Sequence, residues 1–216
     1  MTKETPSKTG SRRDFIKKST ILVAGSTVAG NLQIARAAHP YGDETIKIGL
    51  VGCGGRGTGA AVQAMNTNGD VNIVAMADVF DDRLQGSYRA IKSKHGDKVK
   101  VTKETMFTGL DAYKQVLEAD IDLIILATPP GFRPLHFEAA VNAGVHVFME
   151  KPVATDAPGV RRVLDANKIA VDKNLCVQVG LQRRHEPAYI ETIARLKDGA
   201  IGDINLGRVY WNGGGV

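Results

Sequence analysis

The sequence has few cysteines, few aromatic residues and no long apolar run. Its two cysteines, Cys53 and Cys176, are too few and too far apart to form a metal site or a disulfide framework. Cys53 lies inside a glycine-rich stretch and Cys176 in an apolar run, so we expect both to be small core residues rather than ligands. Apolar residues make up 43% of the 216, enough for the core of one domain and part of a second.

Most of the chain also lacks excess positive charge. The formal net charge is +5, and residues 1–37 account for all of it with seven Lys/Arg and two Asp/Glu. The rest of the chain holds 21 basic and 21 acidic residues. A neutral body lacks the basic surface that phosphate backbones require, so the composition argues against nucleic-acid binding.

Residues 1–37 have the organisation of a targeting segment. Within 11–18, two arginines precede an aromatic residue, an aliphatic residue and a lysine, as in the twin-arginine export motif. The stretch 21–34 is mildly apolar, but too short and too polar for a stable membrane span. Ala35 and Ala37 then provide the small residues that a signal peptidase requires, which predicts a mature start at Ala38. We expect a twin-arginine signal, recognised by the export machinery, and a periplasmic or otherwise exported protein; a disordered basic tail is the alternative.

From residue 46 onward, aliphatic runs alternate with segments of helical composition. We expect strands at 46–51, 71–77, 121–127, 145–149 and 176–180, and a short one within 99–107. We expect helices at 58–66, 81–94, 111–117, 134–142, 157–174 and 187–199. Continuous apolar strands separated by helices are typical of a parallel sheet covered on both faces. The predicted fold class is α/β, a doubly wound Rossmann sheet.

A glycine-rich turn follows the first strand. Gly52, Gly54 and Gly57 form the pattern Gly-x-Gly-x-x-Gly between a strand and a helix. The first glycine permits the tight turn, the second removes a Cβ that would block a pyrophosphate, and the third allows close helix–strand packing. The helix N-terminus then faces the phosphates. We expect these glycines, with Gly55 and Arg56, to bind a dinucleotide.

An acidic residue ends the second strand. Asp78 comes 21 residues after Gly57. A carboxylate at this place accepts hydrogen bonds from the adenosine ribose and repels a 2′-phosphate, which favours NAD over NADP. Arg56 or Arg83 could instead face a 2′-phosphate, so NADP stays open. The alternative for Asp78 is a solvated acid at a strand end.

Two further turns follow strands that end at the same edge. Ligands of open α/β sheets bind beyond the carboxyl ends of the strands. Thr128 and Pro129 follow the run 121–127, while Glu150 and Lys151 follow the run 145–149. We therefore expect both turns to approach the nicotinamide. No metal site is expected.

These motifs resemble the Gfo/Idh/MocA family, which includes glucose–fructose oxidoreductase, inositol 2-dehydrogenase and their relatives. The similar segments begin near residue 47, and the most specific are 127–129, 134–136, 143–152, 180–187 and 199–204. The resemblance implies an NAD(P)-dependent oxidoreductase that transfers hydride to or from a hydroxyl-bearing carbon of a sugar or cyclic polyol. Since such an enzyme would be exported folded, its cofactor could be loaded in the cytoplasm.

The resemblance also implies the roles of five residues. Lys151 would lie beside the nicotinamide and the substrate hydroxyl, where an ammonium stabilises a developing alkoxide. Glu150 would hold that lysine and the cofactor ribose, so these two form the expected catalytic pair. His136 would lie beside the cofactor, or would be a surface or capping residue. Arg183 and Arg184 would contact cofactor or substrate, or would form interdomain ion pairs.

In this interpretation the chain has four parts. Residues 1–37 form the signal, 38–45 a linker, 46–180 the NAD(P)-binding Rossmann domain, and 181–216 the incomplete start of a C-terminal α/β substrate domain. Residues 204–211 alternate like the opening strand of that domain. We expect a truncated form whose full-length counterpart could be a homo-oligomer. Two other functions stay open: an NAD-assisted glycosidase or lyase, and a non-catalytic dinucleotide-binding fragment.

Overall fold

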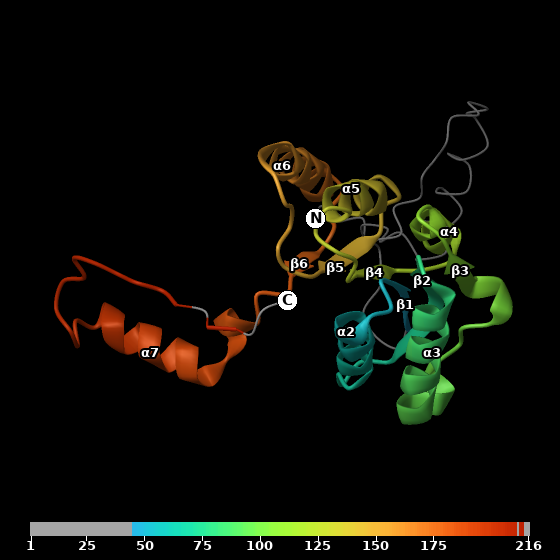
Figure 1. Cartoon of the computed structure of the whole chain (residues 1–216), viewed down its shortest axis with the longest axis horizontal. Helices are drawn as coiled ribbons and strands as arrows, with labels where there is room; N and C mark the ends of the chain where they lie inside the picture. The colour runs from blue at the N-terminus through green and yellow to red at the C-terminus, as the bar shows by residue number, and fades with distance from the viewer. Residues whose placement is uncertain (1–44, 211, 214–216) are drawn as a thin grey trace, which may run out of the picture. The chain divides into compact units, whose positions relative to one another are not determined.

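The computed structural model describes residues 45–210 and 212–213. The expected signal peptide, its cleavage site and nearly all of the linker lie outside the described residues. Six parallel strands form one sheet in the order β3-β2-β1-β4-β5-β6 (Figure 1). The strands are β1 (Ile46–Val51), β2 (Val71–Asp78), β3 (Met106–Thr108), β4 (Leu123–Leu126), β5 (His146–Met149) and β6 (Val177–Val179).

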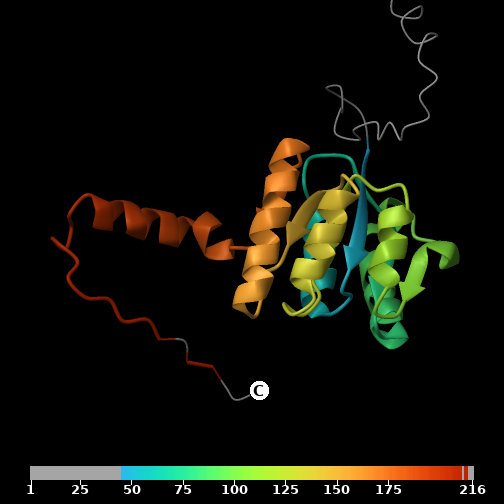
Figure 2. The same ribbon diagram turned by 90° about the horizontal axis from the view of Figure 1, so that it is seen from above.

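Helices cover both faces of this sheet. Helices α2 and α3 lie on one face, and α4, α5 and α6 lie on the other, as Figures 1 and 2 show. The bounds are α2 (Gly55–Met65), α3 (Asp81–His95), α4 (Ala112–Glu118), α5 (Arg133–Asn142), α6 (Ala157–Asp172) and α7 (Pro187–Lys197). Short 3-10 helices occupy Gly96–Lys98, Lys103–Thr105 and Gln182–His185. The predicted doubly wound Rossmann fold is confirmed.

The central strands are mostly apolar because they face a core on both sides, whereas the edge strands β3 and β6 are only partly buried. Successive side chains of a strand point to opposite faces. In β4, Ile125 packs in the core beneath α2 and α3, whereas Ile124 and Leu126 pack beneath α4, α5 and α6. All three are 1% exposed or less, and full burial of such a side chain contributes about 1.5–3 kcal/mol. Two cores thus hold the sheet's carboxyl edge in place.

The observed elements depart from the predicted bounds mainly at their ends. The largest difference at the site is that α2 begins at Gly55, three residues before the expected Thr58. Glycines are poor helix formers, so composition alone places the start of this helix too late. The stretch 99–107, where a short strand is expected, contains a bridge between Val99 and Ile73, a 3-10 turn and the start of β3.

Two expectations were wrong, and both concern residues whose burial or strand pairing requires a neighbouring segment. Cys53 is buried as expected, but Cys176 is exposed because it precedes β6, the edge strand of the sheet. Residues 204–210 form no strand, and Trp211 lies outside the described residues. A strand needs a hydrogen-bonded neighbour, and no strand in the described part of the chain pairs with this stretch. Its alternating side chains are therefore exposed to solvent.

Within the ranges 45–210 and 212–213, no helix has both the length and the hydropathy that a bilayer crossing requires. The same ranges contain no group of three or more His, Cys, Asp or Glu side chains arranged to hold a metal ion.

Candidate cofactor site

The glycine loop joins β1 to α2 and needs glycine at two places for different reasons. Gly52 has a φ of +97°, and a Cβ there would lie 2.6 Å from the backbone at Ala127 and Thr128. A Cβ on Gly57 would lie 1.8 Å from the carbonyl oxygen of Gly52. The first glycine therefore permits the turn, and the third permits α2 to pack against it, as the motif predicts.

The middle of the loop is open on the side where a phosphate would bind. Gly54 and Gly55 have no heavy atom within 4 Å of an added Cβ. Gly54 is the N-cap of α2, and no described side chain accepts a hydrogen bond from the helix's first amides there. Free amides and the positive end of a helix dipole attract anions. These residues therefore fit the pyrophosphate of a dinucleotide.

Asp78 lies at the carboxyl end of β2 beside the loop. Its Oδ2 accepts a hydrogen bond from the Cys53 N–H at 2.6 Å, and its Oδ1 accepts one from the Phe80 N–H at 3.0 Å. The backbone thus orients the carboxylate, which is not the freely solvated acid of the alternative interpretation. Each oxygen retains lone pairs for ribose hydroxyls.

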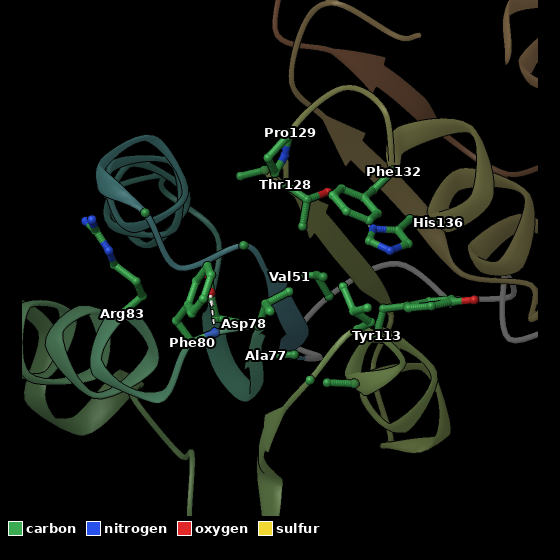
Figure 3. Close-up of a pocket in the computed structure, with 17 residues that line it drawn as sticks. Val51, Ala77, Asp78, Phe80, Arg83, Tyr113, Thr128, Pro129, Phe132 and His136 are labelled. Atoms are coloured by element: carbon green, nitrogen blue, oxygen red, sulfur yellow. Dashed lines mark hydrogen bonds between the residues drawn. The ribbon is translucent and has the colours of Figure 1, made fainter. Parts of the chain in front are cut away.

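A pocket of about 620 Å³ opens between these loops (Figure 3). It brings together six of the predicted site residues: Gly52, Gly54, Asp78, Thr128, Pro129 and His136. Its walls are mostly apolar, and they include residues that sequence reasoning missed: Val79, Phe80, Leu110, Tyr113 and Phe132. Apolar walls with a few polar groups suit a nucleobase. Arg83 also lines this pocket, so the structure keeps one of the two arginines near the ribose end.

His136 is part of the pocket wall and is buried within α5. Its Nδ1 lies 3.2 Å from Oγ1 of Thr128, and its ring centroid lies 4.3 Å from that of Tyr113. Burial and the nearby Arg133 guanidinium lower the pKa of the imidazole from 6.5 to about 4. Its Nε2 is buried without a hydrogen-bond partner among the described residues. The ring is therefore neutral at pH 7, and it is neither a surface residue nor a helix cap.

Arg133 begins α5 and binds the backbone of the turn that follows β4. Its side chain is 1% exposed and donates to the carbonyl oxygens of Leu126 and, at 2.6 Å, Thr128. Burial lowers the pKa of the guanidinium, while Glu150 opposes that shift. Sequence reasoning missed this residue because a buried arginine and a solvated one look alike in a single sequence. The only signal was a charge in an otherwise apolar first turn.

The second predicted turn lies at the end of β5. Glu150 is buried, and its Oε1 accepts a hydrogen bond from Arg56 Nε at 2.7 Å and forms an ion pair with Nη2 at 2.5 Å. The structure thus pairs Glu150 with the glycine loop, and it turns Arg56 toward β5 rather than toward Asp78. Lys151 is exposed beside this pair, and the Lys151–Pro152 peptide bond is cis.

The two remaining predicted residues lie after β6. Arg183 and Arg184 are exposed in the 3-10 helix Gln182–His185. Arg183 donates to Glu186 at 2.7 Å, and its guanidinium carbon lies 5.0 Å from the Tyr189 ring centroid. The contacts described for Arg183 thus lie within its own segment, and its role at the cofactor stays a prediction.

Comparison with known proteins agrees with this geometry. Residues 46–181 match the model of the oxidoreductase family with an NAD-binding Rossmann fold, GFO_IDH_MocA. The chain belongs to this family. Among its relatives, inositol 2-dehydrogenase of Rhizobium meliloti (strain 1021) is 31% identical over 162 residues, which cover 75% of this chain and 44% of the relative. The chain thus spans less than half the length of such relatives.

Solved structures give the same result. Myo-inositol 2-dehydrogenase from Lactobacillus plantarum superposes with a TM-score of 0.61 at 26% identity, covering 74% of this chain and 43% of that one. Scyllo-inositol dehydrogenase from Lactobacillus casei, solved with NAD(H) and scyllo-inositol, has a TM-score of 0.59 at 28% identity, with coverages of 74% and 43%. The expected family is confirmed.

Proposed function

We propose that this chain binds NAD along the carboxyl edge of its sheet, and that the protein that carries it oxidises a hydroxyl of a cyclic polyol or sugar. The observation that carries the proposal is the contact between Arg56 and Glu150 at 2.5–2.7 Å. It joins the phosphate-binding loop to the turn that holds Lys151. Inositol dehydrogenases among the relatives support the substrate class.

The adenosine half of the cofactor fits the pocket beside Asp78. Its base would lie between the apolar side chains that include Phe80 and Phe132, and its ribose hydroxyls would bind the Asp78 carboxylate. The carboxylate's negative charge disfavours a 2′-phosphate, which favours NAD. Arg83 in the same pocket is the feature that would support NADP instead.

The reacting end would lie at Lys151. When bound, NAD accepts a hydride from the carbon that bears the substrate hydroxyl. The exposed Lys151 ammonium would stabilise the alkoxide as that hydroxyl loses its proton, and would help to pass the proton to solvent. Glu150, which is held by Arg56, would fix the chain from which Lys151 extends.

Hydride transfer tests this proposal directly. In the protein that carries this chain, absorbance of NADH is measured with myo-inositol, scyllo-inositol or glucose as substrate, and NAD binding is measured by calorimetry. Lys151→Ala is expected to lower kcat at least about 100-fold while NAD still binds. Lys168→Ala, which removes an exposed lysine of α6, is the control.

Three outcomes would overturn parts of the proposal. Absence of saturable NAD binding rejects the cofactor. Unchanged turnover in Lys151→Ala rejects the role of that lysine. Conversion of a glycoside with no net NADH formed would favour the NAD-assisted glycosidase or lyase.

We also propose export by the twin-arginine route, which rests on the sequence of residues 1–37 alone. Cell fractionation tests it: replacement of Arg12 and Arg13 by lysine is expected to retain the protein in the cytoplasm. Lys8→Arg, which lies outside the motif and keeps the charge of the segment, is the control. Equal distribution of all forms between the fractions would reject this route.

A further inference from the structure

The Glu150 carboxylate lies between two segments that are distant from it in sequence. Glu150 is buried at the end of β5, and its carboxylate lies against the first turn of α2, which supplies Arg56. On its other side lies Gly180, just after β6: a Cβ there would be 2.7 Å from Oε1 and 3.0 Å from Oε2. The carboxylate therefore fills the space that any other residue at position 180 would need.

The backbone of Glu150 is held as well. Its N–H donates to the carbonyl oxygen of Leu126 at 3.0 Å, the same oxygen that Arg133 binds. With both its backbone and its carboxylate held, Glu150 sets the direction in which the chain leaves β5. Lys151 is the next residue, so its position follows from these contacts.

The two partners of the ion pair differ in exposure. The Arg56 side chain is 45% exposed and that of Glu150 is 9% exposed. Loss of Glu150 would leave a guanidinium that water can solvate, whereas loss of Arg56 would leave a buried carboxylate without its direct partner. That carboxylate would then move toward water. This change would displace the turn at Lys151.

We propose that Arg56 is a positioning residue, which holds Lys151 at the nicotinamide through Glu150 instead of acting mainly on the pyrophosphate. This inference rests on the proposed function. It assigns one ion pair the task of coupling the phosphate-binding loop to the reacting end of the cofactor. Arg56→Lys should then rescue part of the effect of Arg56→Gln, because an ammonium keeps the charge but loses the two-point contact.

The experiment compares two ligands on the whole chain by calorimetry. ADP contains the adenosine and both phosphates, while NAD adds the nicotinamide half. We expect Arg56→Gln to weaken NAD about tenfold and ADP less than about threefold, with Arg56→Lys between Arg56→Gln and the unmodified chain. Gly180→Ala, which displaces the same carboxylate without changing Arg56, should produce the same pattern. Circular dichroism verifies that each variant is folded.

Arg162→Gln is the matched control. Arg162 is 44% exposed in its ion pair with Glu138, between α6 and α5, so its loss should change neither affinity. Equal weakening of NAD and ADP by Arg56→Gln would overturn the inference, because it would place the guanidinium on the phosphates. Unchanged affinities in both Arg56→Gln and Gly180→Ala would also overturn it. If the unmodified chain binds no NAD, the proposed function itself fails.

Discussion

The backbone N–H of Cys53 donates a hydrogen bond of 2.6 Å to the Asp78 carboxylate, which joins the glycine loop to the end of β2. Because this contact uses Oδ2 while Phe80 binds Oδ1, the loop and the carboxylate keep a fixed relation. A single side chain thus helps to shape the loop and presents the charge that would face the adenosine ribose.

Asp78→Asn tests this second role. The amide oxygen can still accept the Cys53 N–H, and only the exposed Phe80 N–H loses its acceptor, so the fold should persist, whereas the charge that repels a 2′-phosphate is lost. We expect the preference for NAD over NADP, measured as the ratio of Kd values by calorimetry, to fall at least about tenfold. Asp82→Asn, an exposed change in the first turn of α3, should leave the ratio unaltered. An unchanged ratio in Asp78→Asn would remove the basis for NAD specificity.

Gly57 and Gly59 of α2 allow a matched comparison of how an added methyl group changes the free energy of unfolding. Gly57→Ala places a Cβ 1.8 Å from the Gly52 carbonyl oxygen, while a Cβ on Gly59 meets no atom within 4 Å. We expect Gly57→Ala to lower the free energy of unfolding by about 3 kcal/mol, because backbone must move. Gly59→Ala should raise it by about 0.5–1 kcal/mol, since alanine favours the helix. Urea titration of both variants measures the difference, and similar values for the two would contradict the packing described here.

The fold and the backbone of the site could be predicted because their signals are local. The glycine pattern and Asp78 each follow an aliphatic run, so strand ends could be located without knowing the packing. The pocket walls could not be predicted in this way. Phe80, Leu110 and Phe132 come from three separate loops, and folding alone brings them together. A single sequence does not record that proximity.

Burial of polar and edge residues also escaped prediction, for a different reason. Arg133 and Glu150 carry charges that a sequence pattern places in solvent, yet their partners come from other segments and permit burial. Cys176 and the stretch 204–210 have apolar patterns typical of a core, yet they are exposed. The hydropathy pattern of a sequence indicates which side chains can be buried, but the residues that pack against them in the folded chain determine whether they are.

His136 makes stability depend on pH in a defined direction. Its pKa in the folded chain is about 4, below its ordinary value of 6.5, so the unfolded chain binds more protons between these values. The contribution is complete above pH 6.5 and is lost as pH falls toward 4, by about 3 kcal/mol at most. Urea titrations at pH 7 and 4.5 should show a smaller difference for His136→Gln than for the unmodified chain. His185→Gln, at an exposed position, should leave the difference unchanged, and an equal effect of both variants would contradict the assignment.

The two cysteines should differ sharply in reactivity. Burial, with the nearby Asp78 carboxylate, raises the pKa of the Cys53 thiol to about 12, and the sulfur donates to the Ala77 carbonyl oxygen at 3.4 Å. Cys176 is exposed. Since the thiolate is the reactive form, a disulfide reagent at pH 8 should modify one thiol per folded chain and two after denaturation. Cys176→Ser should abolish the reaction of the folded chain, and Cys53→Ser should not. Rapid modification of Cys53 in the folded Cys176→Ser variant would show that the glycine loop opens to solvent, and the packing of Cys53 under Asp78 would then be wrong.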